Sequence, residues 1–504
     1  MNPPIAPSLL GPRDQTTLLG WTPKPGQREL LVATSAWPDG DTKSPAVFAL
    51  ALQNGGWTAR QFLTMTDAVG PMALGDVDGD GHLDLFVGGR AVTGRYPQLA
   101  SSALFINKAG TLERSASADP TLKNVGLVNG GVFTDLNGDG RPDLVLACEW
   151  GPVRVFLNNG GVLTEATQSL GLDKLTGWWT SIAAGDIDGD GRMDLVAGNW
   201  GLNTPYTASA SAPARLFHGD FSGQGGMDMI EAYDSSDLGK IAPFRNLSFM
   251  SVGLPVLRAR VASHWAYAAS SVADLLGDKF ATAQQLQATT LATTLLLNRG
   301  TRFEVVALPP EAQFAPVFGV CIADFDGEGH ADVFLAQNFS ATRGLEATYN
   351  AGRGLLLLGG SNGVLRTVRG DASGIRIYGD QRGAATGDFD GDGRIDLVVS
   401  QNGNATKLLQ NQQGKPGLRI RLEGTAGNPT AVGAQLGWQN RALHEIQAGS
   451  GYWSQNSAVQ VIARSSGDTP LVVRWPGGKT TMSPVPPNAR EITIDIEGKV
   501  TAKP

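Results

Sequence analysis

The sequence predicts an all-β protein, and three observations support this prediction. The 504 residues include Gly 66 and Pro 28, which leaves little room for long uninterrupted helices. An acidic nine-residue motif recurs along the chain, as expected of a repeat architecture. Short apolar runs flank its copies, so each motif is predicted to be a loop between two buried strands. Strand, acidic loop, strand, turn and strand is the plan of one β-propeller blade.

Five complete copies of the motif share the frame Asp-x-Asp-Gly-Asp-Gly-x-x-Asp, with asparagine or glutamate as occasional replacements. They occupy residues 76–84, 135–143, 186–194, 324–332 and 388–396. A sixth copy at residues 220–228 keeps the frame but has serine and glutamine at its third and fifth positions. Residues 17–66 add a set of strands whose acidic loop has decayed. We therefore predict a seven-bladed β-propeller.

The second copy shows the order of elements within one repeat. The apolar run 132–134 precedes the acidic loop, and the run 144–146 follows it. A third run, 153–157, leads to Asn158-Asn159-Gly160, which is a turn signal. We expect at least three antiparallel strands per blade.

The repeats divide the chain into an N-terminal tail, a propeller and a second domain. We expect the tail at residues 1–16 and the propeller at residues 17–415. The longest interval between motifs holds the one strongly helical stretch, about residues 263–298, which we predict to be an insertion that caps a ring face or walls a pocket. At residues 417–500, polar and apolar positions alternate, which predicts a separate antiparallel β domain.

The acidic loops have the chemistry of a hard-cation site. Oxygen ligands from positions 1, 3, 5 and 9 and the carbonyl of position 7 match the six to eight oxygens that calcium prefers. The glycines at positions 4 and 6 permit the tight positive-φ backbone that such a loop needs. Without a cation, the clustered carboxylates would raise one another's pKa. We predict about five Ca²⁺ ions that act as structural staples, in preference to the smaller, more strictly octahedral Mg²⁺.

The predicted ligands are the residues at these five positions of each loop, with position 7 contributing only its backbone carbonyl. They are Asp76, Asp78, Asp80, His82 and Asp84; Asp135, Asn137, Asp139, Arg141 and Asp143; Asp186, Asp188, Asp190, Arg192 and Asp194; Asp324, Asp326, Glu328, His330 and Asp332; and Asp388, Asp390, Asp392, Arg394 and Asp396. The sixth loop keeps only Asp220 and Asp228, so we expect it to bind a cation weakly or not at all.

Composition disfavours several classes of protein. The formal net charge is -7, and no run of lysine or arginine offers the basic surface that nucleic acids require. No apolar stretch is long enough to span a membrane. Cys148 and Cys321 lie far apart in apolar runs, which predicts buried free thiols. The oligomeric state stays open.

The acidic loops between short strands resemble FG-GAP/VCBS repeats, the calcium-binding propeller blades also found in integrin α-chains. This resemblance covers about residues 70–415. The C-terminal region resembles the ASPIC/UnbV domain of bacterial relatives of cartilage acidic protein. The segments that carry this likeness are 427–429, 432–434, Gly449-Ser-Gly-Tyr452-Trp-Ser454-Gln455 and 473–478. The resemblance implies calcium-dependent binding, extracellular or periplasmic, as in a secreted or cell-adhesion protein, although no export signal is visible at the N-terminus. It supplies no catalytic residues.

Two functional hypotheses remain open. The first is a calcium-stabilised binding module that recognises a protein or a glycan through a propeller face. The alternative is an enzyme of lyase or cyclase type, with a pocket at the propeller axis capped by the 263–298 insertion and with His264 or Asp274 as acid or base. Trp178, Trp179 and Trp200 flank the third acidic loop and form either inter-blade packing or a ligand-stacking face.

Overall fold

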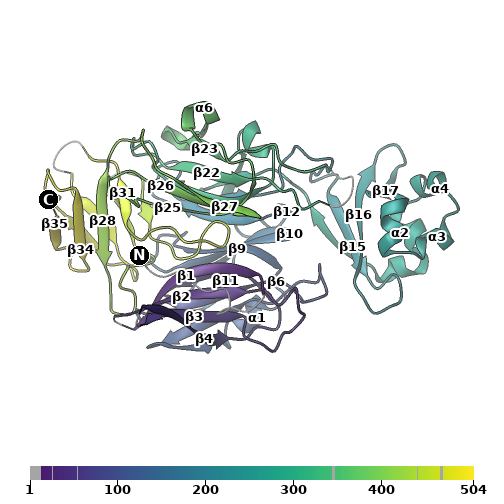
Figure 1. Ribbon diagram of the computed structural model, residues 1–504, viewed down its shortest axis with the longest axis horizontal. Helices are drawn as coiled ribbons and strands as arrows, with labels where there is room; N and C mark the ends of the chain where they lie inside the picture. Colours follow the sequence, from purple (N-terminus) through teal and green to yellow (C-terminus); the bar gives the residue numbers. More distant parts are fainter. Residues whose placement is uncertain are drawn as a thin grey trace.

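The computed structural model describes residues 13–24, 26–53, 55–342, 347–439, 441–465 and 469–503. Most of the expected N-terminal tail lies outside these residues. The described chain is nearly all β, and almost every strand pair is antiparallel (Figure 1). The all-β prediction is confirmed. Cys148 and Cys321 are both free and buried.

Six sheets form the blades of the propeller. Blade 1 contains β1 (Gln15–Lys24), β2 (Gln27–Thr34), β3 (Val47–Gln53) and β4 (Gly56–Leu63), and blade 2 contains β5 (Ala68–Gly75), β6 (Asp84–Ala91), β7 (Ala103–Lys108) and β8 (Thr111–Arg114). Blade 3 contains β9 (Leu127–Thr134), the long β10 (Asp143–Asn158), β11 (Leu163–Glu165) and β12 (Thr176–Trp178). A short helix, α1 (Asp119–Leu122), joins blades 2 and 3.

The remaining blades repeat this plan. Blade 4 contains β13 (Ser181–Gly185), β14 (Asp194–Gly198), β19 (Thr294–Asn298) and β20 (Phe303–Ala307). Blade 5 contains β21 (Val317–Ala323), β22 (Asp332–Gln337), β23 (Leu355–Leu358) and β24 (Arg366–Val368), and blade 6 contains β25 (Asp380–Gly387), β26 (Asp396–Asn402) and β27 (Asn404–Leu409). The short helices η3 (Pro310–Gln313), η4 (Ser361–Gly363) and α6 (Gly370–Ser373) lie in connections. The first strands of consecutive blades contact one another and form the inner wall.

The predicted count of seven blades is one too many. A seventh sheet precedes the C-terminal region, but it is inserted between two strands of blade 4 and lies outside the ring. The chain leaves blade 4 after β14 and returns at β19, and the intervening insertion projects from the ring (Figure 1). The insertion sheet contains β15 (Ala214–Gly219), β16 (Asp228–Ser235), β17 (Lys240–Pro243) and β18 (Gln284–Ala288). The sixth acidic loop joins β15 to β16, so it marks a hairpin of the insertion and not a blade.

The helices of the insertion begin earlier than the sequence pattern indicates. They are α2 (Leu247–Gly253), α3 (Leu257–Arg260), α4 (His264–Ala268), α5 (Val272–Leu276) and η2 (Gly277–Thr282). The second half of the predicted helical stretch forms β18 and β19 instead, because its apolar residues pair with β15 and β14. The helices bury Leu257, Leu275 and Leu276 against the insertion sheet, in a core separate from those of the blades.

The C-terminal region contains two further sheets. One orders its strands as β31 (Gln460–Ile462), β28 (Leu418–Glu423), β34 (Glu491–Asp495) and β35 (Val500–Lys503). The other orders them as β30 (His444–Glu445), β29 (Gln435–Trp438), β32 (Leu471–Arg474) and β33 (Thr480–Ser483). β28 and β34 are parallel, in contrast to the purely antiparallel prediction. One hydrophobic core joins Leu418, Leu436 and Ile492 of this region to Leu19 and Leu74 of blades 1 and 2.

Residues 448–457 of the C-terminal region pass through the centre of the ring, and we call them the axial segment. This segment contacts the first strand of each of the six blades, at Gly20, Leu74, Asn129, Ile182, Val320 and Thr386. The bonds include Leu74 N–H to the Ala448 carbonyl and Gly451 N–H to the Ile182 carbonyl, both 2.8 Å. The axial segment therefore links the first blade to the last and fills the axis.

Candidate functional site

Five acidic loops hold their last aspartate in the same way. Each loop joins the first strand of a blade to its second, and the aspartate at position 9 is buried at the start of that second strand. In the first loop, Asp84 accepts the N–H of Val77 on one oxygen and that of Asn107, from the third strand, on the other, both at 2.8 Å. Asp143, Asp194, Asp332 and Asp396 make the matching pair of bonds at 2.7–3.0 Å. This aspartate thus ties three strands together.

The first aspartate of each loop also has a fixed position. It accepts the N–H of the position 6 glycine at 2.7–3.1 Å in all five loops. The glycines at positions 4 and 6 have positive φ, from 73° to 88°, as the loop prediction requires. Within the described residues, the buried Oδ1 atoms of Asp76 and Asp186 have no hydrogen-bond partner. Such unpaired buried oxygens fit a cation.

Carboxylates converge in four of the loops. The sets Asp76/Asp78/Asp84, Asp186/Asp188/Asp194, Asp324/Asp326/Asp332 and Asp388/Asp390/Asp396 each bring three carboxylate oxygens within 4.8 Å of one another. The loop at 135–143 has Asn137 at position 3, which leaves it one carboxylate fewer. These residues suit a divalent cation with oxygen ligands.

Burial makes these carboxylates costly to ionise without a cation. It raises the pKa of Asp84, Asp143, Asp194 and Asp332 to about 7. It raises the pKa of Asp76, Asp186 and Asp324 to about 6, and that of Asp135 above its usual value. A dication at the centre of each cluster would stabilise the ionised forms.

Several carboxylates of the loops, including the buried side chain of Asp388 at position 1, pair with basic side chains. Lys108 contacts Asp78, Arg299 contacts Asp188 and Lys415 contacts Glu328, each at 2.5 Å. Arg419 of the C-terminal region pairs with Asp388. At position 7, Arg141, Arg192 and Arg394 each pair with the acid at position 5, namely Asp139, Asp190 and Asp392, and each donates to a backbone carbonyl near the third strand. His82 lies 3.2 Å from Asp80, and His330 is exposed.

The sixth loop has the backbone geometry without the acidic cluster. Asp220 accepts the Gly225 N–H at 2.9 Å and Asp228 accepts the Ser222 N–H at 2.7 Å. Asp220 is exposed, and the Gly225 N–H lowers its pKa. The glycine frame therefore forms this loop whether or not the cation ligands are present.

Asparagines at the end of the third strands are functional residues that the sequence analysis missed. Asn158, Asn298 and Asn411 donate their side-chain N–H to Val77, Leu136 and Phe325, which are position 2 carbonyls of loops in the preceding blade, at 2.7–2.9 Å. Each asparagine thus connects its own blade to the acidic loop of its neighbour. The sequence indicated Asn158 only as part of a turn, because an inter-blade contact leaves no local pattern.

The C-terminal region docks on the acidic loops. Thr425 donates to the Gly81 carbonyl at 2.8 Å, Gly477 N–H to the Gly140 carbonyl at 2.9 Å, and Leu443 N–H to Asp186 at 2.9 Å. Ala463 packs beside Gly329 of the fourth loop. Gly417 N–H donates to the Gly393 carbonyl of the fifth loop at 2.8 Å. All five loops therefore face this region.

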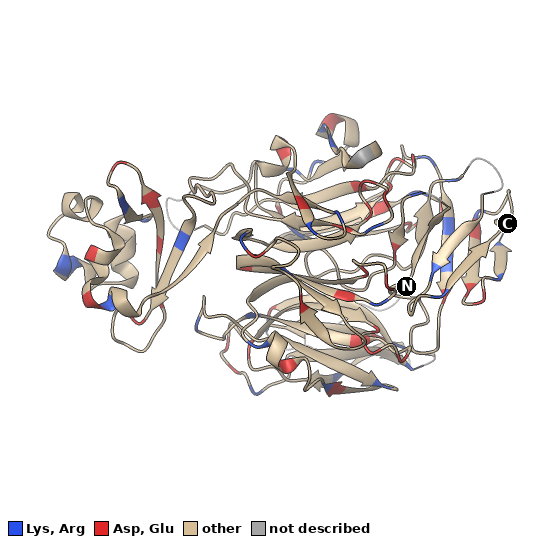
Figure 2. Ribbon diagram, turned by 180° about the vertical axis from the view of Figure 1, so that it is seen from behind, with Lys and Arg blue, Asp and Glu red and all other residues tan. Residues whose placement is uncertain are grey.

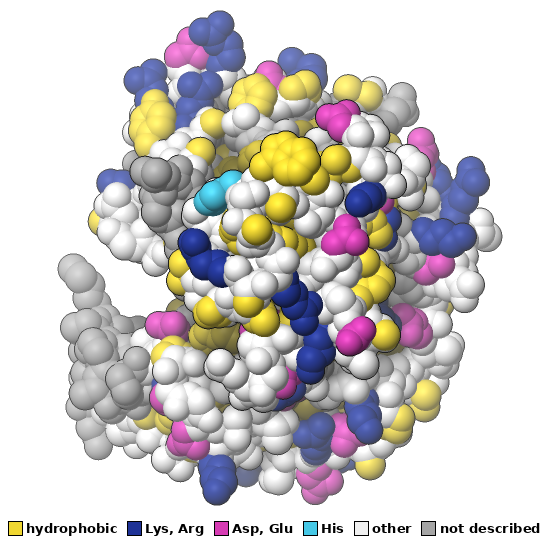
Figure 3. Space-filling model, turned by 90° about the vertical axis from the view of Figure 1, so that its right-hand side faces the viewer, with side chains coloured by type: hydrophobic (Ala, Val, Ile, Leu, Met, Phe, Trp, Pro, Cys, Tyr) yellow, Lys and Arg dark blue, Asp and Glu magenta, His cyan; other side chains and the backbone are white. Residues whose placement is uncertain are grey.

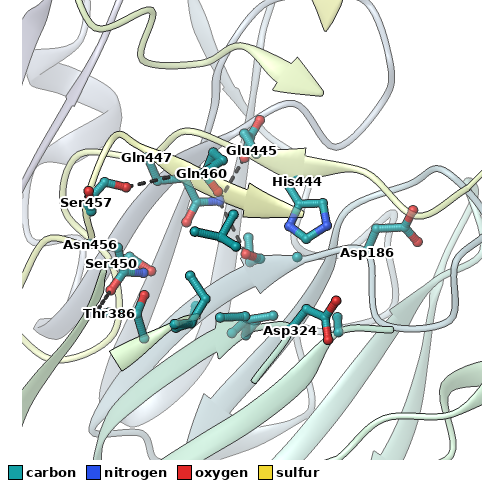
Figure 4. A pocket seen from close by; sticks show the side chains of 18 of the residues that line it. Asp186, Asp324, Thr386, His444, Glu445, Gln447, Ser450, Asn456, Ser457 and Gln460 are labelled. Carbon is teal, nitrogen blue, oxygen red and sulfur yellow. Dashed lines mark hydrogen bonds between the residues drawn. The ribbon is translucent and has the colours of Figure 1, made fainter. Parts of the chain in front are cut away.

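A small cavity of about 60 Å³ lies in this interface (Figure 4). Its lining includes Asp186, Asp324, His444 and Glu445. Burial lowers the pKa of His444 to about 4 and raises the pKa of Glu445, so both side chains favour their neutral forms. The cavity is a packing gap beside two cation loops and has no room for an organic ligand.

A much larger cavity, of about 910 Å³, opens at the other end of the ring. Its lining includes the start of β9 and β21, the end of β6 and residues just after β14 and β22, whereas the five acidic loops of the blades lie at the opposite strand ends. Met227 and Asp228 of the sixth loop, on the insertion, also line it. The axial segment contributes Tyr452, and the insertion contributes α2 and part of β16. We call this space the aromatic cavity, since Tyr96, Trp150, Trp178, Trp200, Tyr206, Phe249, Phe318, Phe339, Tyr349 and Tyr452 line it.

Two ion pairs supply the polar part of the aromatic cavity. Glu149 accepts from Arg90 at 2.8 Å, from the Tyr96 hydroxyl at 2.7 Å and from Asn129 at 3.3 Å. On the insertion side, Glu231 pairs with Arg245 at 2.5 Å and accepts the Tyr206 hydroxyl at 3.0 Å. Charged residues of both signs are scattered over the ribbon of the whole molecule (Figure 2).

The predicted tryptophan face forms in part. Trp178 and Trp200 line the aromatic cavity, with ring centroids 5.2 Å apart at 88°. Trp179 is fully buried between blades and serves packing. His264 begins α4 on the insertion, and Asp274 closes a capping box with Ser271 at the start of α5. Neither residue lines the aromatic cavity, so the acid and base of the enzyme hypothesis do not meet there.

The insertion exposes apolar side chains both at its outer end and beside the aromatic cavity. Trp265 on α4 is 82% exposed and Val252 on α2 is 83% exposed. Figure 3 looks at this end and shows hydrophobic side chains spread over it, with one histidine among them. Val252 also lines the aromatic cavity, whereas Trp265 does not.

Comparisons with known proteins agree with the resemblance drawn from the motifs. Residues 135–197 match the model of the FG-GAP-like repeat family. The chain is 24% identical over 367 residues to cartilage acidic protein 1 of Xenopus tropicalis, a match that covers 70% of this chain and 42% of that protein. The chain therefore aligns with less than half of this relative's length. The predicted FG-GAP and ASPIC/UnbV resemblance is confirmed.

Solved structures with some likeness include two rhamnogalacturonan lyases. Rhamnogalacturonan lyase YesW is 14% identical with a TM-score of 0.28, covering 82% of this chain and 75% of that chain. The exotype rhamnogalacturonan lyase YesX is 12% identical with a TM-score of 0.32, covering 90% of this chain and 74% of that chain.

Within the described residues, no helix has the length and apolar character that crossing a bilayer requires.

Proposed function

From its FG-GAP-like repeats and its similarity to cartilage acidic protein 1, we propose that the protein is a calcium-stabilised binding module that works outside the cytoplasm. Its ligand is a protein or a glycan, and the module acts in adhesion or capture, in an extracellular or periplasmic setting. Such compartments are calcium-rich, which suits a protein with five acidic loops.

About five Ca²⁺ ions occupy the acidic loops in this proposal. The residues at positions 1, 3, 5 and 9 supply side-chain oxygens, and position 7 supplies its carbonyl. The unpaired oxygens of Asp76 and Asp186 and the raised pKa of the buried aspartates support this assignment. The ions fix the loops on which the C-terminal region rests, and they take no part in chemistry.

The observation that carries the binding proposal is the aromatic cavity. Among the described residues, the axial segment occupies the ring from the side of the acidic loops and leaves a cavity of about 60 Å³ there, whereas the cavity of about 910 Å³ lies at the other end of the axis. Aromatic side chains with a few convergent polar groups are typical of ligand sites. The lyase or cyclase hypothesis has less support, because His264 and Asp274 lie outside this cavity.

Ligand arrays test the proposal directly. The purified full chain is applied to an oligosaccharide array and to an array of extracellular proteins, in calcium and in EDTA. We expect at least one class to bind in calcium and to lose most of its signal in EDTA. The absence of any ligand on both arrays, or binding that EDTA leaves unchanged, contradicts the proposal. Elemental analysis of the purified protein checks the ion count.

A further inference from the structure

We infer that the aromatic cavity binds a neutral oligosaccharide. This inference rests on the proposed binding function and narrows it to one site and one class of ligand. Its basis is the combination of cavity size, partly exposed aromatic side chains and internally neutralised ion pairs.

The size of the aromatic cavity is the first argument. Small-molecule sites enclose roughly 300–1,000 Å³, and this cavity of about 910 Å³ lies near the upper end of that range. Its walls come from the ring, the insertion and the axial segment, so it is a built recess between parts of the fold. Its volume is sufficient for an oligosaccharide.

The aromatic side chains are the second argument. Phe249 is 42% exposed, and Trp200, Phe339 and Tyr349 are half-buried around the opening. Trp200 lies 5.1 Å from Phe339 and 5.3 Å from Tyr349, measured between ring centroids. A contiguous aromatic surface that remains accessible to solvent indicates a binding site. Pyranose rings present flat C–H faces, which pack well against such surfaces.

The ion pairs are the third argument. Arg90 neutralises Glu149, and Arg245 neutralises Glu231, so the pairs add no net charge to the lining. Asp228 contributes one further carboxylate, which disfavours anionic ligands such as polyuronates or phosphates. The four charged groups of the two ion pairs are already bound to one another, so a cationic ligand would have only the Asp228 carboxylate with which to pair. A neutral ligand is therefore favoured.

The type of polar group selects a polyol among neutral ligands. Carboxylate oxygens accept hydrogen bonds, and guanidinium and amide groups donate them. In this cavity Glu149 lies within hydrogen-bond distance of Arg90 and Asn129, so acceptors and donors alternate over a few ångströms. A sugar hydroxyl is both donor and acceptor and can satisfy such neighbours together. A row of hydroxyls beside a flat C–H face matches the two kinds of surface in the lining.

The test uses the calcium-loaded full chain and calorimetric titration with neutral, acidic and amino hexasaccharides. We expect neutral chains to bind at least tenfold more tightly than the charged ones. Trp200→Ala removes an aromatic side chain of the cavity, and Glu149→Gln removes the negative charge of its ion pair with Arg90 and replaces one of its two acceptor oxygens by a donor. Each should weaken binding of the neutral chain at least tenfold. Trp265→Ala is the matched control, since Trp265 is 82% exposed and lies outside the cavity.

Circular dichroism and the melting temperature confirm that each variant is folded before titration. Should Trp200→Ala misfold, Phe249→Ala, at a partly exposed position of the same wall, takes its place. Saccharide binding that the cavity variants and Trp265→Ala affect equally overturns the inference while the binding proposal stands. Binding of proteins alone, or tighter binding of charged saccharides, also overturns it. Failure of both ligand arrays overturns the inference and the proposed function together.

Discussion

The backbone N–H of Leu443 donates to Oδ2 of Asp186 at 2.9 Å, so the first carboxylate of the third acidic loop is held by the C-terminal region. The same oxygen accepts the N–H of Gly191 within the loop, while Oδ1 has no partner among the described residues. One aspartate thus faces the loop, the C-terminal region and the proposed cation. We therefore expect cation binding to the third acidic loop and docking of the C-terminal region to depend on each other.

Chelation should destabilise the protein and loosen its C-terminal region. Ligand at 100 times its dissociation constant stabilises the folded state by about 2.7 kcal/mol per site. We therefore expect EDTA to lower the melting temperature by on the order of 10 °C. Scanning calorimetry measures this shift, and limited proteolysis should then cut near residues 410–417 before the blades. A melting temperature that is equal in calcium and in EDTA would exclude structural ions.

Stability of the calcium-free protein should fall as the pH rises from about 4 to about 7. Burial raises the pKa of Asp84, Asp143 and Asp194 to about 7, so the folded state binds more protons than the unfolded state between pH 4 and pH 7. Stability then decreases as pH increases through this window. Calcium should abolish or reverse the trend, because it binds the ionised carboxylates. Denaturant titrations at several pH values measure how the free energy of unfolding changes with pH, once in EDTA and once in calcium. The same change with pH in both conditions would contradict this prediction.

Removing the amide of Asn158 should weaken the contact between blades 2 and 3. Asn158→Ala leaves the buried Val77 carbonyl without its 2.9 Å hydrogen bond, which costs about 1–3 kcal/mol. Asn159→Ala is the matched control, because the Asn159 side chain is exposed and donates to the Thr164 hydroxyl of β11 within the same blade. We expect a change within about 0.5 kcal/mol. Chemical denaturation of both variants measures the difference. If Asn158→Ala and Asn159→Ala lower the free energy of unfolding equally, the Asn158 side chain does not stabilise the contact between blades.

Sequence alone predicted the blades well because each acidic loop and its strands are encoded locally. The buried aspartate at position 9, such as Asp84, the paired glycines and the apolar runs recur in one window. The same local pattern led to the wrong prediction that the hairpin at residues 220–228 belongs to a blade. Its glycines predict the loop but not the sheet to which the flanking strands belong. The helix boundaries were missed because residues 284–298 form strands only through pairing with β14 and β15.

The candidate site was harder to predict than the blades. The aromatic cavity gathers Arg90, Glu149, Trp200 and Tyr452 from distant parts of the chain, and no local pattern connects them. Trp178 and Trp200 were indicated only as a possible stacking face. The path of the axial segment was not predicted at all, because its partners lie on six strands far apart in sequence.

Close packing of the axial segment should make Gly451 intolerant of a side chain. Its φ is +62°, and an added Cβ would lie 2.6 Å from the Val320 carbonyl oxygen. Gly477 has φ +83° but no atom within 4 Å of an added Cβ, so Gly477→Ala carries only the left-handed backbone strain of about 1–2 kcal/mol. Gly451→Ala should lower the free energy of unfolding by more than Gly477→Ala does, because either β21 or the axial segment must shift to make room for the added methyl group. Denaturant unfolding of the two variants separates strain from steric contact. Equal losses of unfolding free energy in the two variants would show that the axial segment is not packed against β21. The axial segment would then be less tightly held than the hydrogen bond from Gly451 to Ile182 indicates.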